Sequence, residues 1–148
     1  MTFIKETTIR PFGVNSSEDH GKMMEGIGML AAPAPVLSDT ATCGETLRLL
    51  SERQQEACIV ICDAKQRSVG LVMSDAFYIQ MNAEYEAEHL YELPVSRLMS
   101  LYPLTVDFET SVRVVREWSE ARPARTRQEA IIVTREGRFF GVVQPTDL

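Results

Sequence analysis

The sequence has no hydrophobic run long enough to cross a membrane. Residues 1–12 include charged side chains and hold no apolar stretch of signal-peptide length. The longest weakly polar stretch, residues 26–37, is interrupted by Pro33 and Pro35 and is too short to span a bilayer. We therefore expect neither a secretory leader nor a membrane partner.

Cysteine and positive charge are also scarce. The three cysteines are odd in number and have no secretory context, so we expect reduced thiols in a cytoplasmic protein. The net charge of −6 argues against a binder of duplex nucleic acid, which normally carries a basic face. A small anionic ligand stays possible, because a few arginines or a helix N-terminus can hold one.

Motifs for catalysis and metal binding are absent as well. The sequence contains no nucleophile elbow, phosphate loop or cluster of metal ligands. Cys58 and Cys62 are four residues apart on one expected strand, so their side chains lie about 13 Å apart, too far for one zinc ion or a disulfide. Glu86 and His89 have the spacing of a di-iron bundle site, but a second such pair is missing. We expect no catalytic residue and no metal site.

What the sequence does contain is one pattern that occurs twice. Residues 35–42 (PVLSDTAT) and 103–110 (PLTVDFET) align at an offset of 68, with Pro, Asp and Thr in register. A helical segment follows each copy, and Thr42 and Thr110 are expected to cap these helices. A single copy would have too little core to be stable alone, so we expect the two to pack together.

Two short β-rich runs follow each predicted helix. They span residues 57–61 and 69–72 in the first copy and 130–134 and 139–143 in the second, where Glu136-Gly137 signals a hairpin. Trp118, on the second helix, is expected at the centre of the second copy's core. The repeating unit is strand, helix, strand, strand, helix, which predicts an α/β (α+β) fold.

Short segments precede both copies, and a longer one connects them. Residues 76–92 are expected to form a connecting helix. Val95 and Leu98 before the second copy, and Ile27 and Leu30 at the matching places before the first, are expected to point inward. The predicted organisation is an N-terminal arm (1–25), a first repeat with connecting helix (26–92) and a second repeat (93–148).

The two copies resemble the repeats of the cystathionine-β-synthase (CBS) family. The resemblance lies in VSRLM (95–99), PLTV (103–106) and GVVQPTDL (141–148), and the first copy ends in the similar GLVMSD (70–75). It covers about residues 26–148. It implies two β-α-β-β-α repeats packed by their sheets as a pseudo-twofold Bateman module. It also implies a non-catalytic regulator of an attached or partner effector, commonly a homodimer.

The resemblance further implies a ligand in the cleft between the repeats, namely AMP, ADP, ATP or a related adenosyl compound. Asp147, with Thr146 before it, falls where the family binds ribose, and a helix N-terminus beside it would favour a phosphate. The base would lie against the backbone of Leu104, Thr105, Ala130 and Ile131. The matching places in the first repeat are Leu37, Cys58, Ser74 and Asp75.

The sequence leaves two functions open. Glu56 and Glu129 stand where nucleotide-sensing members often carry a basic residue. Arg122, Arg125 and Arg127 could compensate, but a solvated loop is the favoured interpretation of these arginines. The alternative to a ligand sensor is therefore a ligand-free dimerisation or docking module.

The surroundings of the repeats suggest an effector class. The Tyr/Glu-rich connecting segment and the REGRF run (135–139) look like CBS pairs that accompany diguanylate cyclase or phosphodiesterase domains in bacterial signalling proteins. The sequence stops at Leu148, where the last helix of the second repeat is expected to begin, so we expect it to belong to a longer chain.

Overall fold

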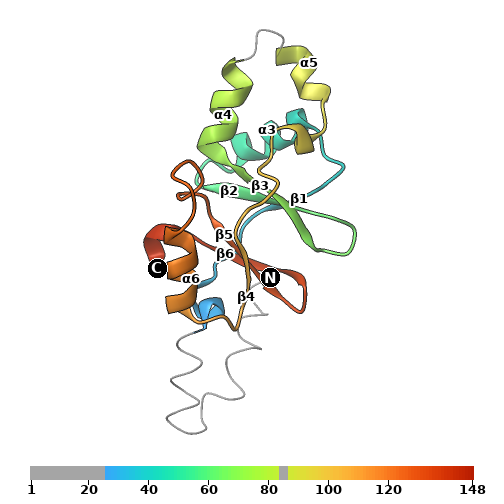
Figure 1. Cartoon of the computed structure of the whole chain (residues 1–148). Helices are drawn as coiled ribbons and strands as arrows, with labels where there is room; N and C mark the ends of the chain where they lie inside the picture. The colour runs from blue at the N-terminus through green and yellow to red at the C-terminus, as the bar shows by residue number, and fades with distance from the viewer. Residues whose placement is uncertain (1–25, 84–86) are drawn as a thin grey trace, which may run out of the picture. The chain divides into compact units, whose positions relative to one another are not determined.

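The computed structural model describes residues 26–83 and 87–148 of the chain (Figure 1). The predicted N-terminal arm, residues 1–25, lies outside the described residues. The described residues form two compact units. One contains residues 34–103 and is called the first-repeat unit below. The other combines residues 26–33 with 104–148 and is called the second-repeat unit.

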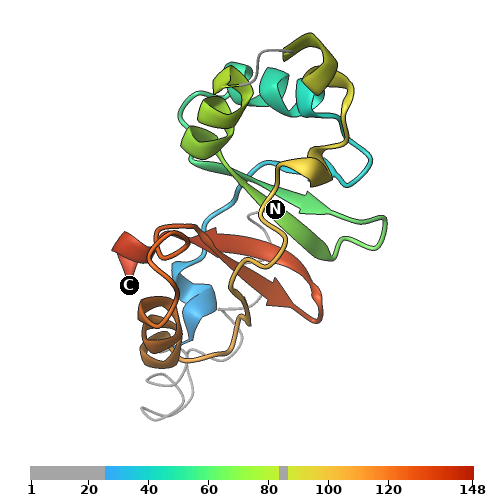
Figure 2. The same ribbon diagram turned by 45° about the horizontal axis from the view of Figure 1, so that its top comes forward.

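The first-repeat unit is a three-stranded sheet with helices on one side (Figures 1 and 2). Its strands, in spatial order, are β1 (Val36–Ser38), β2 (Cys58–Cys62) and β3 (Ser68–Met73), with β1 parallel and β3 antiparallel to β2. Its helices are α3 (Cys43–Glu52), α4 (Ser74–Ala83), α5 (Ala87–Glu92) and the 3-10 turn η3 (Val95–Arg97).

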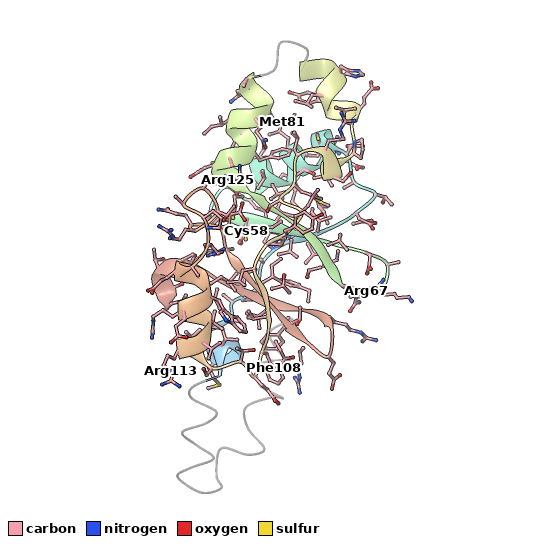
Figure 3. The ribbon with its side chains drawn as sticks, viewed as in Figure 1. Cys58, Arg67, Met81, Phe108, Arg113 and Arg125 are labelled. Carbon is pink, nitrogen blue, oxygen red and sulfur yellow. The ribbon has the colours of Figure 1, made fainter. Side chains whose placement is uncertain are left out.

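The core of this unit forms between one sheet face and the three α-helices. Ile59 and Ile61 of β2 are fully buried against Phe77 and Met81 of α4 (Met81 is labelled in Figure 3). The predicted cap of α3 is confirmed. Thr42 Oγ1 accepts from the backbone N–H of Glu45 at 3.1 Å, and the Glu45 carboxylate accepts from the N–H of Thr42 at 2.9 Å. This capping box fixes the start of the helix.

The second-repeat unit repeats the same plan. Its strands are β4 (Thr105–Asp107), β5 (Ile131–Arg135) and β6 (Arg138–Val143), with β4 parallel and β6 antiparallel to β5. The remaining elements are α6 (Val112–Glu120) and the 3-10 turns η2 (Ile27–Leu30) and η4 (Pro145–Asp147). Glu136 and Gly137 have φ values of 54° and 81°, the positive pair of a type I′ turn, so the hairpin prediction is confirmed. The predicted α/β (α+β) class is confirmed too.

The helix of the second-repeat unit begins one residue later than predicted. Ser111, not Thr110, is its N-cap, and Ser111 Oγ accepts from the N–H of Val114 at 3.2 Å. A shift of one residue turns a helix face by about 100°. Val115 and Ser119 are therefore buried, while Trp118 is 49% exposed. The prediction that Trp118 lies at the centre of this core is wrong.

Two further predictions about helices change in the structure. The segment expected to be one connecting helix contains two, α4 and α5, which contact each other; residues 84–86 between them lie outside the described part. Among the segments that precede the repeats, Ile27 and Val95 are fully buried and Leu98 packs beside the core. Leu30 is 41% exposed, so its predicted inward position is wrong.

The segment that precedes each repeat packs in the unit of the other repeat. Ala32 and Val142 exchange two backbone hydrogen bonds, of 2.8 and 2.9 Å, which place residues 26–33 in the second-repeat unit. Leu71 and Ser100 exchange the equivalent pair, of 2.7 and 3.0 Å, in the first-repeat unit. The packed units are thus divided differently from the sequence repeats at 26–92 and 93–148, whose boundaries stay a prediction.

Candidate functional site

The topology brings the predicted site residues of each repeat to one end of their own sheet. In the second-repeat unit β4 and β5 are parallel and begin at this end, and the antiparallel β6 finishes there. The end therefore gathers the start of β4, the start of β5 and the turn after β6. Those segments hold Leu104, Thr105, Ala130, Ile131, Thr146 and Asp147.

Some of the predicted residues in the second-repeat unit are fully buried, and others are exposed. Ala130 and Ile131 are fully buried, and the N–H of Ile132 donates to the carbonyl of Leu104 at 2.9 Å. Thr146 and Asp147 are exposed. Asp147 is the last residue of η4, and its N–H donates to the carbonyl of Gln144 at 2.8 Å. The expectation that Asp147 opens a helix is not met, but its carboxylate is accessible to a ligand.

The matching residues of the first repeat are mostly buried. Cys58 is 2% exposed at the start of β2, and Leu37 packs against the helical core from β1. Ser74 is 8% exposed at the start of α4. Its hydroxyl donates to the carbonyl of Glu56 at 2.8 Å, and its N–H donates to the carbonyl of Ala57 at 2.9 Å. Ser74 therefore joins the first turn of α4 to the start of β2, and of the four predicted residues Asp75 alone is exposed.

The prediction of a solvated arginine loop between α6 and β5 is wrong for Arg122. Arg122 is half-buried, and its Nη2 donates to Ser119 Oγ at 2.9 Å, to the carbonyl of Arg127 at 2.9 Å and to that of Glu129 at 3.2 Å. Burial lowers the pKa of Arg122, and the Glu129 carboxylate opposes this shift. The Nη1 atom is buried without a partner. Arg125, labelled in Figure 3, is exposed.

Sequence reasoning missed the structural role of Arg122, although the sequence holds a signal for it. The strand pairing places Ser74, two residues after Val72, where the second repeat has Pro145, two residues after Val143. Proline has no N–H, so the hydrogen bond made by the Ser74 N–H has no counterpart there. A donor is then required from elsewhere, and Arg122 supplies one.

The described residues hold no recognisable metal site, and none of their helices has the length and apolar character needed to cross a membrane. Cys43, Cys58 and Cys62 are buried, and none of them forms a disulfide among the described residues. Burial raises the pKa of Cys62 to about 11, and the nearby Asp63 and Asp39 carboxylates add to the shift. A thiol with so high a pKa is protonated at neutral pH and is a poor nucleophile.

No family model matches the sequence, and none of the curated proteins matches it either. Solved structures do resemble the chain. The cytosolic domain of the Mg²⁺ channel MgtE, in complex with ATP, superposes with a TM-score of 0.65 at 21% identity over 83% of this chain and 47% of that one. CBSX2 in complex with AMP gives a TM-score of 0.63 at 17% identity, over 82% and 91%.

A third similar structure carries the family's name. The CBS domains of a transcriptional regulator from Streptococcus pneumoniae give a TM-score of 0.61 at 18% identity, over 82% of this chain and 94% of that one. Both compact units of the present chain take part in the strand, helix, strand, strand plan that its two sequence copies predicted. The chain therefore has the fold of a pair of CBS domains.

Proposed function

We propose that the chain is a non-catalytic regulatory module that senses an adenine nucleotide and controls an attached or partner effector. The observation that most supports this is the bound ligand of two proteins with the same fold. The MgtE cytosolic domain was solved in complex with ATP, and CBSX2 was solved in complex with AMP.

The geometry of the second-repeat unit is compatible with such a ligand. An exposed carboxylate such as that of Asp147 can accept hydrogen bonds from both hydroxyls of a ribose. The Thr146 hydroxyl beside it can donate to a phosphate. The base would lie beside the segment that leads into β5, where Glu129 is partly exposed and Ala130 and Ile131 are fully buried.

Regulation then follows from linkage. A nucleotide can bias an effector only if it binds two states of the module with different affinity. The effector we propose is a diguanylate cyclase or phosphodiesterase domain in the same longer chain. A homodimer in the cytoplasm is the assembly we propose for it.

The test is a thermal-shift and calorimetric screen against AMP, ADP, ATP and S-adenosylmethionine. At a ligand concentration near 100 times Kd, binding adds about 2.7 kcal/mol to the free energy of unfolding. That stabilisation raises Tm by several degrees in a domain of this size. The shift should disappear in Asp147→Ala and persist in Asp39→Ala, which removes an exposed carboxylate from the turn after β1.

If none of these compounds shifts Tm or releases heat, the nucleotide-sensor proposal fails. The ligand-free dimerisation or docking module would then be the better account of the chain.

A further inference from the structure

One exposed side of α6 carries four charged side chains. They follow the spacing i, i+3, i+4 and i+7, which places them side by side along the helix, and they are Arg113, Arg116, Glu117 and Glu120. This set is called the charged face below. Arg113, labelled in Figure 3, points outward from the start of the helix. Within the described part of the chain, no salt bridge joins any of the four to a partner.

The order of these charges is the reverse of the order that stabilises an isolated helix. A helix has a partial positive charge at its N-terminal end and a partial negative charge at its C-terminal end. In α6 both arginines precede both glutamates, and the first turn has no acidic residue and the last turn no basic one. Each arginine also stands four positions before a glutamate, which is the weaker order for a pair within one helix. The helix itself therefore gives no reason for this arrangement.

The equivalent side of α3 is covered within its own unit. Counted from the N-caps Thr42 and Ser111, Gly44 occupies the place that Arg113 has in α6. A Cβ at Gly44 would lie 3.1 Å from the carbonyl oxygen of Tyr91, because α5 packs against α3. An arginine does not fit under a backbone that approaches so closely. The charged face of α6 is therefore suited to a polar partner and not to a cover of this kind.

We propose that the charged face is the surface through which two copies of the chain associate. The inference rests on the homodimer of the proposed function and assigns its interface. A two-fold axis between Arg116 and Glu117 sets α6 antiparallel to its copy, so that Arg116 faces the partner's Glu117 and Arg113 faces the partner's Glu120. The axis repeats both pairs, and every charge of the face then meets an opposite charge. A parallel pair would place each side chain opposite itself, which like charges disfavour.

Two further electrostatic features favour this antiparallel pair. The N-terminal end of each helix, with its arginines, lies beside the C-terminal end of the other, with its glutamates, so the helix dipoles also attract. The net charge of −6 does not oppose the contact at this place. Residues 26–33 carry no charge, and residues 104–148 contain seven arginines and seven acidic residues, so the second-repeat unit is neutral.

Analytical ultracentrifugation of the full chain at low salt measures the dimer dissociation constant. Arg116→Glu and Glu117→Arg each place like charges across the axis, so each should weaken self-association at least about tenfold. An equimolar mixture of these two variants should associate about as tightly as the unaltered chain, because opposite charges meet again in the mixed dimer. The double variant Arg116→Glu/Glu117→Arg exchanges the two charges and should recover self-association to within about threefold.

The matched control is Arg125→Glu, which reverses an exposed charge of the same unit outside the charged face and should change the dissociation constant by less than about twofold. Circular dichroism establishes that each variant is folded. Raising NaCl from about 0.1 M to about 1 M shortens the Debye length from about 10 Å to about 3 Å and should weaken the dimer of the unaltered chain.

The outcomes separate this interface from the proposed function. Self-association that Arg116→Glu leaves unchanged would overturn the interface and leave the homodimer standing, as would a mixture or a double variant that does not recover. An unaltered chain that stays monomeric would overturn both the interface and the homodimer. The nucleotide screen is independent of these results, since none of the substituted side chains belongs to the predicted ligand site.

Discussion

Arg122 and Arg127 each donate to the other's backbone carbonyl. Arg122 Nη2 lies 2.9 Å from the carbonyl oxygen of Arg127, and Arg127 Nη2 lies 2.9 Å from that of Arg122. Burial lowers the pKa of Arg122, the Glu129 carboxylate opposes this shift, and the nearby charge of Arg127 adds to it. The reciprocal bonds close the loop between α6 and β5 on itself, and this gives the approach to β5 a defined position.

The first prediction concerns the stability that this loop depends on. Arg122→Ala removes the donor shared by Ser119, Arg127 and Glu129, so we expect it to lower the free energy of unfolding by about 1–3 kcal/mol. Urea unfolding can be followed by the fluorescence of Trp118, the only tryptophan, which lies in α6 of the same unit. Arg125→Ala should change stability by no more than about 0.5 kcal/mol. Equal effects of the two substitutions would contradict the structural role of Arg122.

The second prediction compares two neighbours on α6. Val115 is fully buried and Trp118 is 49% exposed. Val115→Ala should therefore cost about 1.5–3 kcal/mol through lost burial and a cavity. Trp118→Ala should cost less than about 1 kcal/mol, although it removes far more side chain. Unfolding followed by circular dichroism measures both; a larger loss for Trp118→Ala would show that α6 presents the other face to the sheet.

The sequence predicts the local features of this fold, but it does not predict which face of α6 is buried. The succession strand, helix, strand, strand along each repeat, the Thr42 cap and the Glu136-Gly137 turn depend on local signals, and all are confirmed. The face of α6 depends on one inserted residue before it. Thr110 and Ser111 are both competent caps, so the pattern alone could not tell which of them begins the helix.

Other features depend on contacts between residues far apart in the chain. The pairing of Ala32 with Val142 exchanges the preceding segments between the units, and no local pattern encodes it. For the candidate site, the residues that the resemblance named lie at one end of their own sheet, and their role in binding stays a prediction. The resemblance could not separate the buried Ser74 from the exposed Thr146, because that difference arises from the hydrogen bonds of Ser74 and the missing N–H of Pro145.

The third prediction uses the glycines beside these exchanged segments. A Cβ at Gly141 would lie 2.9 Å from the carbonyl oxygen of Ala32 and 3.1 Å from the Cβ of Ala31. Ala32 cannot retreat without breaking its two bonds to Val142. A Cβ at Gly70 would collide with the side chain of Met99, which has several rotatable bonds and can move. Gly141→Ala should therefore destabilise by about 2–3 kcal/mol and Gly70→Ala by about 1 kcal/mol.

A double-mutant cycle sharpens this third prediction. Met99→Ala removes the atoms that a Cβ at Gly70 would meet, so Gly70→Ala should cost less in the Met99→Ala background than in the unaltered chain. The cost of Gly141→Ala should not depend on Met99, because its neighbours are Ala31 and Ala32. Thermal unfolding of the six proteins measures both couplings, and a zero coupling at Gly70 would mean that Met99 is not the obstacle.

The fourth prediction concerns pH. Burial, Asp63 and Asp39 raise the pKa of Cys62 from an ordinary 9.0 to about 11 in the folded chain. Below pH 9 the thiol is protonated in both the folded and the unfolded state and adds no pH dependence. Between pH 9 and 11 the unfolded chain releases this proton while the folded chain keeps it, so the free energy of unfolding falls as pH rises.

The control for this pH effect is Cys62→Ala, which removes the titrating thiol. Urea unfolding measured from pH 8 to 11 should show a steeper loss of stability in the unaltered chain than in Cys62→Ala, since lysines, tyrosines and Cys43 titrate in both proteins. Parallel curves would mean that Cys62 ionises at the same pH in the folded and unfolded states. In that case the end of β2 would be open to solvent. The carboxylates of Asp39 and Asp63 would then not raise the pKa of the Cys62 thiol.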